Sequence, residues 1–495
     1  MLEVAGKRVT VMGLGRFGGG IGVTRWLAAQ GADVLVTDLD PADKLRDSLA
    51  QVNDLVERGS VALRLGEHNV ADFTTCDIVV ANPAVPKPWD NRFLRAAAAA
   101  GVPVTTEVRL VVERLPWWSG SPSRMPASGK GGVIGITGSA GKSTTTSMVA
   151  HILRRVLQEG RVYMGGNIGG SLLGELGSIN DTDWVVLELS SAMLYWLGEG
   201  VGFSEARGWS PSVAVLTNIL PNHIDWHGDF AHYARSKQGI FAFQRPGDVA
   251  IESVGSTSAS PVQRYSAAAK GPVTIVRVDA DSVRDALPPT LNLRVPGEHN
   301  RVNALVASTA VAAALARESG GKEGRINPRA VGNAAALLAD FRGLPHRLEF
   351  VGEFAGVKCY NDSKCTTPEA ALLAVAAFEP LPGRARIHLI AGGYDKGSDL
   401  TPVANLAPTI ARMYTIGKTG PTIAAAGRDA GGGDRVVECG TLERAVAAAM
   451  ASGKPGDVLL LSPACASWDQ FTNFEERGKL FARLVRERAG AGVGA

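Results

Sequence analysis

The sequence predicts an α/β protein of three domains, in which each domain is a mostly parallel β-sheet covered by helices. Three observations lead to this prediction. The chain has 495 residues, enough for roughly three domains of ordinary size. Short apolar stretches typical of strands alternate with longer stretches of helical pattern, the order found in parallel sheets. The composition also changes at two points, which divide the alternating series into three parts.

The first domain is expected at residues 1–118. It ends within a stretch rich in Pro, Ser and Gly at 116–132, a composition that predicts a linker. In chain order, the predicted elements are a strand at 7–15, a helix at 23–31, strands at 32–38 and 76–83, and a helix at 91–101 that Gly101 ends.

The second and third domains are expected at residues 119–343 and 344–495, with the boundary in the segment "FRGLPHR". Both repeat the alternation of strands and helices. In chain order, the central domain has predicted strands at 132–138, 183–191, 212–220 and 248–253 and a helix at 300–318, and the last domain has strands at 385–393, 411–417 and 457–465.

The overall composition excludes several classes of protein. The net charge is +3 and Lys and Arg form no long run, so nucleic acid and anionic membranes are not expected as main partners. The five cysteines are scattered without a C-x-x-C pair, which favours a reducing compartment over disulfides or a structural zinc site. No leader precedes the first strand, and no apolar run reaches the roughly 20 residues of a membrane span. We therefore expect a cytoplasmic protein.

A glycine-rich turn follows the first predicted strand. Gly13, Gly15 and Gly18 match the pattern G-x-G-x-x-G, and Asp38 ends the second strand about twenty residues later. Such a turn lets the backbone and a helix N-terminus approach a diphosphate, which NAD and UDP both carry. A tight turn without a ligand is the alternative, and a dehydrogenase that uses NAD is the other enzyme class that this motif suggests.

A second glycine turn, "IGITGSAGKSTTTS", begins at residue 134. It is shorter than the common P-loop, because Ile136 stands where the first glycine of that motif belongs. The backbone of Gly138–Lys142 can surround phosphate oxygens, Lys142 can neutralise the β- and γ-phosphates, and the hydroxyl of Ser143 or Thr144 can bind Mg²⁺. The loop therefore predicts an ATP site.

Two charged residues stand at apolar positions. Glu188 closes the buried strand "WVVLE", which predicts either a Mg²⁺ ligand or a salt-bridged core carboxylate. Lys237 shares one helical face with Phe230, Ala234 and Phe241. Its ammonium either reaches water at the end of a buried stem or has a lowered pKa, so that the neutral amine can react.

Polar residues cluster after strands of two predicted sheets. Ligands of open parallel sheets bind beyond the carboxyl ends of the strands, and a polar loop without function is the alternative for any single residue. The residues in these positions are Glu188, His223, Asp225, Lys396 and Ser467.

Several motifs together resemble one family. "GSAGKST", "GGNIG", "ELSS", "LTNI" with "NHIDWH", and "ARSKQGIF" resemble the Mur ligases of peptidoglycan precursor synthesis, whose folylpolyglutamate synthase relatives share the ATP loop. "NDSKCTTPEAAL", "GGYDKGSD" and "LSPACASWDQFTNFEERG" are similar to the D-glutamate-adding branch of that family. The resemblance implies Rossmann-like first and third domains and a central domain like a P-loop ATPase.

The resemblance also implies a reaction. ATP would phosphorylate the alanine carboxylate of UDP-N-acetylmuramoyl-L-alanine, and the amine of D-glutamate would displace phosphate from the acyl phosphate. Two Mg²⁺ ions are implied, one on Ser143 and Glu188 and the other near His223 and Lys237. Lys237 would carry a carbamate formed from CO₂. The implied catalytic residues are Lys142, Glu188, His223 and Lys237.

The implied binding residues fall into three sets, and the protein is expected to act as a monomer. The ATP set is Gly138, Ser139, Ala140, Gly141, Lys142, Ser143, Thr144, Asn300, Asn303, His346, Arg347 and Asp362. The set for the UDP substrate is Gly15, Arg16, Phe17, Asp38 and Asn167. The D-glutamate set is Lys364, Thr366, Lys396, Ser467 and the backbone of Phe474, in which two lysines match a dicarboxylate.

The sequence departs from the family pattern at three places. Ala140 replaces a common asparagine in the ATP loop, which should leave backbone contacts intact. Asp38 is followed by Leu39 and Asp40 rather than Thr-Arg, so Arg16 is expected to supply charge to the diphosphate. The linker around Trp117 and Trp118 is long, and we expect it to pack on the domain rather than to bind a partner or a membrane surface.

Three other functions fit the sequence less well. A ligase for a neutral or cationic amino acid would leave Lys364 or Lys396 without a substrate carboxylate. A dehydrogenase would leave the ATP loop, Glu188 and the third domain without a role. A non-catalytic descendant would lack a metal or phosphate residue, and all of these residues are present.

Overall fold

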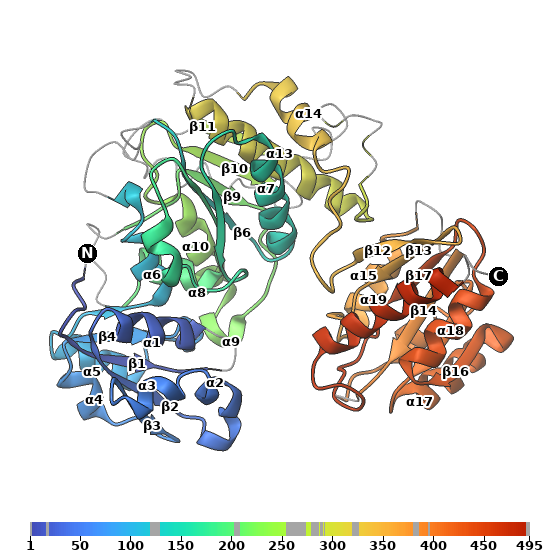
Figure 1. Ribbon diagram of the computed structural model, residues 1–495, viewed down its shortest axis with the longest axis horizontal. Helices are drawn as coiled ribbons and strands as arrows, with labels where there is room; N and C mark the ends of the chain where they lie inside the picture. Colours follow the sequence, from blue (N-terminus) through green and yellow to red (C-terminus); the bar gives the residue numbers. More distant parts are fainter. Residues whose placement is uncertain are drawn as a thin grey trace. The chain divides into compact units, whose positions relative to one another are not determined.

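The computed structural model describes residues 2–15, 19–118, 129–201, 208–253, 274–278, 287, 291, 293–318, 326–379, 386–394 and 397–491. These residues form three α/β domains, each with its own sheet, as predicted (Figure 1). Described residues up to 291 together with 302–338 make one compact unit, and 293–301 together with those from 339 onward make a second. The predicted domain boundaries themselves remain a prediction.

The N-terminal sheet has five parallel strands in the order β3-β2-β1-β4-β5. Its strands are β1 (Arg8–Met12), β2 (Asp33–Asp38), β3 (Val61–Leu65), β4 (Ile78–Ala81) and β5 (Val104–Thr105). Its helices are α1 (Gly19–Ala29), η1 (Ala42–Lys44), α2 (Arg46–Ala50), α3 (Asn53–Glu57), α4 (Val70–Thr74), α5 (Arg92–Ala99), α6 (Glu107–Val112) and η2 (Pro116–Trp118).

The central sheet has six parallel strands in the order β11-β10-β9-β6-β8-β7. Its strands are β6 (Gly132–Thr137), β7 (Val162–Gly166), β8 (Trp184–Glu188), β9 (Val213–Leu216), β10 (Val249–Ser253) and β11 (Thr274–Val278). Its helices are α7 (Lys142–Val156), η3 (Leu173–Ser178), α8 (Ser191–Gly198), α9 (Ile224–His227), α10 (Phe230–Gln238), η5 (Gly239–Phe241), α13 (Glu298–Glu318) and α14 (Pro328–Ala336).

The third sheet also has six strands, in the order β12-β13-β17-β14-β15-β16, and only the β12–β13 pair is antiparallel. Its strands are β12 (Glu349–Phe354), β13 (Val357–Asn361), β14 (Ile387–Gly392), β15 (Arg412–Ile416), β16 (Val436–Gly440) and β17 (Val458–Leu461). Its helices are α15 (Pro368–Ala376), α16 (Thr401–Ala404), α17 (Gly420–Gly427), η7 (Arg428–Gly432), η8 (Gly433–Arg435), α18 (Leu442–Ser452) and α19 (Phe474–Ala491).

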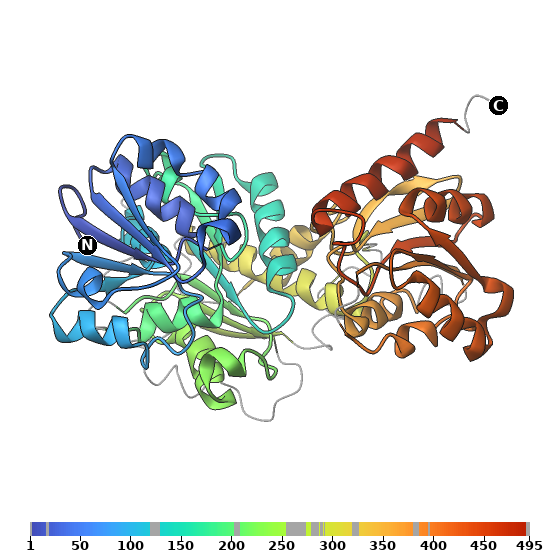
Figure 2. The ribbon, with the colours of Figure 1, turned by 90° about the horizontal axis from the view of Figure 1, so that it is seen from below.

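The central strands are buried along their whole length because helices cover both faces of a parallel sheet. Every residue of β6, β8 and β14 is buried. In the third domain, alternate residues of one strand enter different core clusters, with Leu389 in one and Ile390 in the other. Figure 2 shows α19, in red, running along the sheet of this domain.

The first two domains share one apolar core, which contains Val36 and Leu110 of the first and Leu187 of the second. The start of the linker packs on this unit as expected, since Trp117 is buried and its indole N–H donates to the carbonyl of Asp181 at 3.3 Å. The rest of the predicted linker, 119–128, lies outside the described residues.

Candidate functional site

A cavity of about 1040 Å³ collects the carboxyl ends of strands from the first two sheets. Gly13 and Gly15 follow β1, Asn82 follows β4, Asn167 follows β7, and Ser190 follows β8. The phosphate loop and α10 add Ser139, Lys142, Tyr233 and Lys237, and His223 and Asp225 also line the cavity. Of the residues expected after the strands of this unit, His223 and Asp225 line the cavity, and Glu188 is not among its lining residues.

The phosphate loop depends on two glycines. Gly138 has φ = +149°, and a Cβ there would lie 1.9 Å from the hydroxyl oxygen of Thr217. Gly141 has φ = +80°, and a Cβ there would lie 2.6 Å from Oδ1 of Asn303. Neither position accommodates a side chain, so the turn requires glycine. Helix α7 starts directly after Gly141, and its first N–H groups have no intrahelical acceptor.

Two of the backbone N–H groups expected to face phosphate at 138–142 bond a side chain of the protein. The N–H groups of Ser139 and Ala140 donate to the side-chain oxygen of Asn218, at 3.2 and 2.9 Å. These two bonds shape the loop, and the ammonium of Lys142 donates to the Ser139 carbonyl at 3.2 Å. The carbonyl of Ala140 accepts from the hydroxyl of Thr217 at 2.6 Å, a backbone contact that the side chain at 140 does not affect.

Glu188 offers one open metal ligand. Its side chain is almost fully buried, Oε1 accepts a hydrogen bond from the amide of Asn167 at 2.8 Å, and Oε2 has no hydrogen-bond partner among the described residues. No ion pair to Glu188 occurs in the described part of the chain, which removes the salt-bridge alternative there. A buried carboxylate oxygen without a donor is a costly arrangement that a Mg²⁺ ion would relieve.

Few other side chains near Glu188 are candidate metal ligands. The described residues contain no group of three or more His, Cys, Asp or Glu side chains that could hold a metal. This agrees with Mg²⁺, which usually takes one or two protein ligands and completes its shell with phosphates and water. Ser143 is buried at the start of α7, and Thr144 beside it is half-buried. His223 is exposed, has φ = +52°, and its ring centroid lies 6.3 Å from that of Tyr233.

Lys237 is buried, with 2% of its surface exposed. Burial and the positive charge of Lys142 lower its pKa to about 6, while Glu188 acts in the opposite direction. Its Nζ donates to the carbonyl of Gly138 at 2.7 Å and lies 4.9 Å from the centre of the Tyr233 ring. The hypothesis of a lysine with a lowered pKa is therefore supported, and the alternative of a head group in water is wrong.

The predicted apolar stripe of α10 is only partly right. Phe230 is 42% exposed, and the helix ends at Gln238, so Phe241 lies in the following 3₁₀ turn. Tyr233, Ser236 and Lys237 form the buried face instead. Sequence reasoning missed Tyr233, although its position four residues before Lys237 is the signal that could have identified it.

On the side of the cavity near the first glycine turn, Asp38 shapes the backbone. Its carboxylate accepts from the N–H of Gly15 at 3.0 Å and from the N–H of Asp40 at 2.9 Å. Leu39 points outward and is 64% exposed, whereas Asp40 lines the cavity. Arg16 and Phe17 lie outside the described residues, and so does the predicted compensation by Arg16.

Two lining groups were not anticipated. Glu107 is half-buried, desolvation of its carboxyl group raises its pKa, and its carboxyl oxygen lies 2.5 Å from the hydroxyl of Ser171. His227 lies 2.8 Å from His232 through their Nδ1 atoms and 2.9 Å from the hydroxyl of Ser191, and burial lowers its pKa to about 3. The sequence carried no signal for Glu107 beyond its polarity, whereas His227 ends the motif "NHIDWH".

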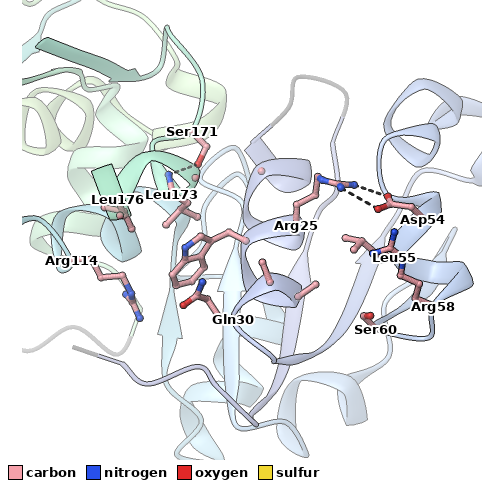
Figure 3. Close-up of a pocket in the computed structure, with 16 residues that line it drawn as sticks. Arg25, Gln30, Asp54, Leu55, Arg58, Ser60, Arg114, Ser171, Leu173 and Leu176 are labelled. Carbon is pink, nitrogen blue, oxygen red and sulfur yellow. Dashed lines mark hydrogen bonds and ion pairs between the residues drawn. The ribbon is translucent and has the colours of Figure 1, made fainter. Parts of the chain in front are cut away.

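A second cavity of similar volume, about 1040 Å³, lies beside α1 and η3 (Figure 3). Arg25 on its wall is paired with Asp54 at 2.6 Å, and the guanidinium of Arg114 lies 4.8 Å from the ring of Trp26. None of the predicted site residues lines it. For that reason this cavity does not compete as the candidate site.

The two predicted nucleotide asparagines lie in α13. Asn303 is at the phosphate loop, where its Oδ1 accepts from Thr145 at 3.4 Å. Asn300 is buried, and its amide donates to the carbonyl of Pro296 at 2.6 Å.

The second compact unit contains the remaining nucleotide candidates. His346 has φ = +63° and lies against Gly478, where a Cβ would come within 2.1 Å of Nδ1. Asp362 accepts from Ser462 at 2.8 Å, and burial raises its pKa to about 7. Arg347 is exposed and close enough to lower that pKa slightly.

The D-glutamate candidates lie beyond the carboxyl ends of β13 and β17. The ammonium of Lys364 lies 5.2 Å from the ring of Phe474, the first residue of α19. Ser467 is buried and Thr366 is half-buried. Lys396 lies outside the described residues. The four described members thus gather around one end of the third sheet.

Comparisons with known proteins agree with this geometry. The models for the Mur ligase MurD-like N-terminal domain, the Mur ligase middle domain and the Mur ligase glutamate ligase domain match residues 7–106, 136–311 and 346–465. The fold is similar to that of UDP-N-acetylmuramate-alanine ligase from Thermotoga maritima, with a TM-score of 0.51 and 17% identity over 97% of this chain and all of that one.

Sequence relatives cover the whole chain. The UDP-N-acetylmuramoylalanine–D-glutamate ligase of Acidobacterium capsulatum is 35% identical over 99% of this chain and 98% of the relative. That of Koribacter versatilis is 35% identical over 99% of each. No described helix has the length and apolarity that a membrane crossing would need. The chain therefore belongs to the Mur ligase family, among its MurD-like members.

Proposed function

We propose that this protein is the ATP-dependent ligase that adds D-glutamate to UDP-N-acetylmuramoyl-L-alanine in peptidoglycan precursor synthesis. One observation carries the proposal: a single cavity brings together Lys142 of the phosphate loop, the buried amine of Lys237 and Asn167, whose amide holds the carboxylate of Glu188. The relatives that carry this name match the chain from end to end.

The chemistry explains why such a cavity is needed. A carboxylate is a poor electrophile, so one of its oxygens first attacks the γ-phosphorus of ATP, and ADP leaves. The amine of D-glutamate then attacks the carbonyl carbon of the acyl phosphate, loses a proton, and phosphate leaves as the amide forms. The protein's main tasks are to place the reactants and to neutralise their negative charge.

The residues of the cavity suit these tasks. Lys142 and the start of α7 would hold the ATP phosphates. Glu188 and Ser143 would hold one Mg²⁺, and His223 with a carbamate on Lys237 would hold another. Bound Mg²⁺ supplies positive charge that offsets the phosphate and carboxylate oxygens. A carbamate forms only on a neutral amine, and the lowered pKa of Lys237 provides one near neutral pH. Its remaining N–H could still donate to Gly138.

The three substrates would each be bound by a separate set of residues. Gly15, Asp38 and Asn167, with Arg16 and Phe17, would bind the UDP substrate. Asn300, Asn303, His346, Arg347 and Asp362 would contact ATP. Lys364, Thr366, Lys396, Ser467 and the backbone of Phe474 would bind D-glutamate, whose two carboxylates match two lysines. The nucleotide-linked substrate favours a cytoplasmic protein, and we expect a monomer.

Phosphate release tests the proposal. The protein would be incubated with ATP, Mg²⁺ and UDP-N-acetylmuramoyl-L-alanine, and with D-glutamate, L-glutamate, L-lysine or meso-diaminopimelate in turn. We expect release with D-glutamate alone. Release with a different amino acid would replace the assignment of Lys364 and Lys396. Absence of release with all four amino acids would contradict the proposed reaction.

A further inference from the structure

Arg477 in α19 is a buried arginine with 1% of its surface exposed. Its guanidinium makes four hydrogen bonds to two separate loops. Nε donates to Oγ of Ser363 at 3.0 Å, and Nη2 donates to the Ser363 carbonyl at 2.8 Å. Nη2 also donates to the carbonyl of Cys465 at 3.1 Å, and Nη1 donates to that of Ala466 at 3.3 Å. One side chain thus joins the loop after β13 to the loop after β17.

All four acceptors are neutral oxygens. No carboxylate of the described chain lies within ion-pair distance of this guanidinium, and burial lowers its pKa only to about 10. Arg477 therefore keeps its positive charge at neutral pH. The charge of Asp469 raises the pKa of Arg477 from beyond ion-pair distance. A buried charge without a directly bonded counter-ion is costly, so the fold retains a cation here at the expense of stability. A neighbouring anionic ligand would recover part of this cost.

Each loop held by Arg477 carries a candidate contact to D-glutamate. Ser363 precedes Lys364 and Thr366, and Ala466 precedes Ser467. The hydroxyl of Ser363 also donates to the carbonyl of Phe474 at 2.8 Å, which ties the start of α19 to the same cluster.

A third loop also meets the guanidinium. Gly393 follows β14 and leads toward Lys396, and a Cβ at Gly393 would lie 3.2 Å from Nη1 of Arg477. Three loops at the carboxyl end of the third sheet therefore pack around one cation.

We propose that Arg477 is a positioning residue for the amino-acid acceptor, holding the loops of Lys364 and Ser467 in register so that both carboxylates of D-glutamate can be bound. The inference rests on the proposed function, because that function places D-glutamate at these loops. Arg477 itself would not touch the substrate. Its planar fork serves several acceptors at once, which the single ammonium of a lysine cannot do at the same positions.

The first test compares Arg477→Lys with a matched control, Arg483→Lys, on the same helix. Arg483 is exposed, and its nearest carboxylate is that of Glu487 at 3.9 Å. Apparent KM values for D-glutamate, ATP and UDP-N-acetylmuramoyl-L-alanine would be measured by phosphate release, together with Tm. We expect Arg477→Lys to raise the KM for D-glutamate at least ~10-fold, because displacement of positioning loops weakens only the ligand that they hold. The KM for UDP-N-acetylmuramoyl-L-alanine should stay within about twofold, and the KM for ATP should rise less than that for D-glutamate, since Asp362 of the ATP set precedes Ser363.

A second variant guards against a failure to fold. Ser363→Ala removes one acceptor of Arg477 and the bond to Phe474 with a loss of a single oxygen. It should raise the KM for D-glutamate selectively but less than Arg477→Lys does. If Arg477→Lys does not fold, the KM for D-glutamate of Ser363→Ala alone decides whether Arg477 has the positioning role.

The outcomes separate the two proposals. A wild-type protein that releases no phosphate with D-glutamate overturns the proposed function before any variant is compared. An active wild type whose variants leave the KM for D-glutamate unchanged overturns the positioning role and leaves the function intact. An equal rise of all three KM values with a lower Tm would show a purely structural role and would also overturn it.

Discussion

Lys237 and Arg477 are two buried cations in different parts of the chain, and they behave in opposite ways. Both side chains have at most 2% of their surface exposed. Burial lowers the pKa of Lys237 to about 6 and that of Arg477 to about 10. At neutral pH the lysine is therefore mostly a neutral amine, whereas the arginine is charged.

The difference comes from chemistry and from surroundings. The pKa of a free guanidinium is higher than that of a free ammonium. Four hydrogen-bond acceptors also surround the guanidinium of Arg477. Lys237 has one close acceptor, the carbonyl of Gly138, and a second cation, Lys142, nearby. Burial alone does not tell what a cation does. A lysine beside another cation becomes a neutral amine available for reaction, while a fully bonded arginine becomes a fixed structural charge.

The largest effect is expected from making Lys237 resemble Arg477. Lys237→Arg places a group that stays charged in proteins at a position that requires a neutral amine for carbamate formation. We expect kcat to fall at least ~10²-fold, because the charge arrangement around the phosphates is lost. Phosphate release measures kcat. ATP binding, which is expected to depend on Lys142, shows whether the variant is folded. A Lys237→Arg variant with ordinary kcat would show that the amine has no such role.

A smaller effect is expected from the carboxylate that faces Lys237. Glu188→Gln removes the open anionic oxygen, so the Mg²⁺ concentration for half-maximal activity should rise ~10- to 100-fold. It also removes the charge that raises the pKa of Lys237, so that pKa should fall below its present value of about 6. A Mg²⁺ titration of phosphate release at saturating ATP checks the first outcome. An unchanged Mg²⁺ requirement would argue that Glu188 binds no metal.

The next smaller effect is expected from pH, which controls carbamate formation on Lys237. As pH falls below about 6, Lys237 becomes protonated and cannot react with CO₂. Carbamate occupancy should then fall about tenfold for each further pH unit, and kcat should follow it. The ¹³C signal of protein incubated with ¹³C-bicarbonate would report the occupancy between pH 5 and 8. The Arg477→Lys variant should show the same acid limb, since Arg477 does not titrate in this range.

The smallest effect concerns stability. Between pH values of about 6 and 10.5, the unfolded chain holds a proton on Lys237 that the folded chain has lost. The unfolded state therefore binds more protons, and the free energy of unfolding should rise with pH by up to about 1.4 kcal/mol per pH unit from this group. Lys237→Met should remove this slope in CO₂-free buffer, as measured by urea unfolding at pH 7, 8 and 9. Equal slopes in wild type and variant would contradict the lowered pKa.

Local patterns sufficed for the framework of the site. The strand–glycine–helix order of β6 and α7, the carboxylate at the end of β8 and the inward position of Lys237 were all predicted and are all observed. These features depend on residues close in the chain, where periodicity and turn chemistry determine the backbone. The error at Phe230 has a related cause, because the spacing of apolar residues permits two neighbouring faces of a helix and only packing selects one.

Contacts across long stretches of chain were not predictable. Asn218 bonds the phosphate loop from 78 residues away, and Arg477 bonds Ser363 from 114 residues away. The motif "FEERG" was noted for the backbone of Phe474, and nothing in its spacing indicated that the arginine faces inward. Such contacts require knowing which strands are neighbours in the sheet.

The sequence by itself determined the three α/β domains and the two glycine turns, and it predicted which residues would bind phosphate, metal and D-glutamate. Only the tertiary structure decided that Lys237 is a neutral amine and Arg477 a fixed cation. The physical reason is that pKa and hydrogen bonding depend on desolvation and on nearby charges. Both are created when segments distant in the chain pack together.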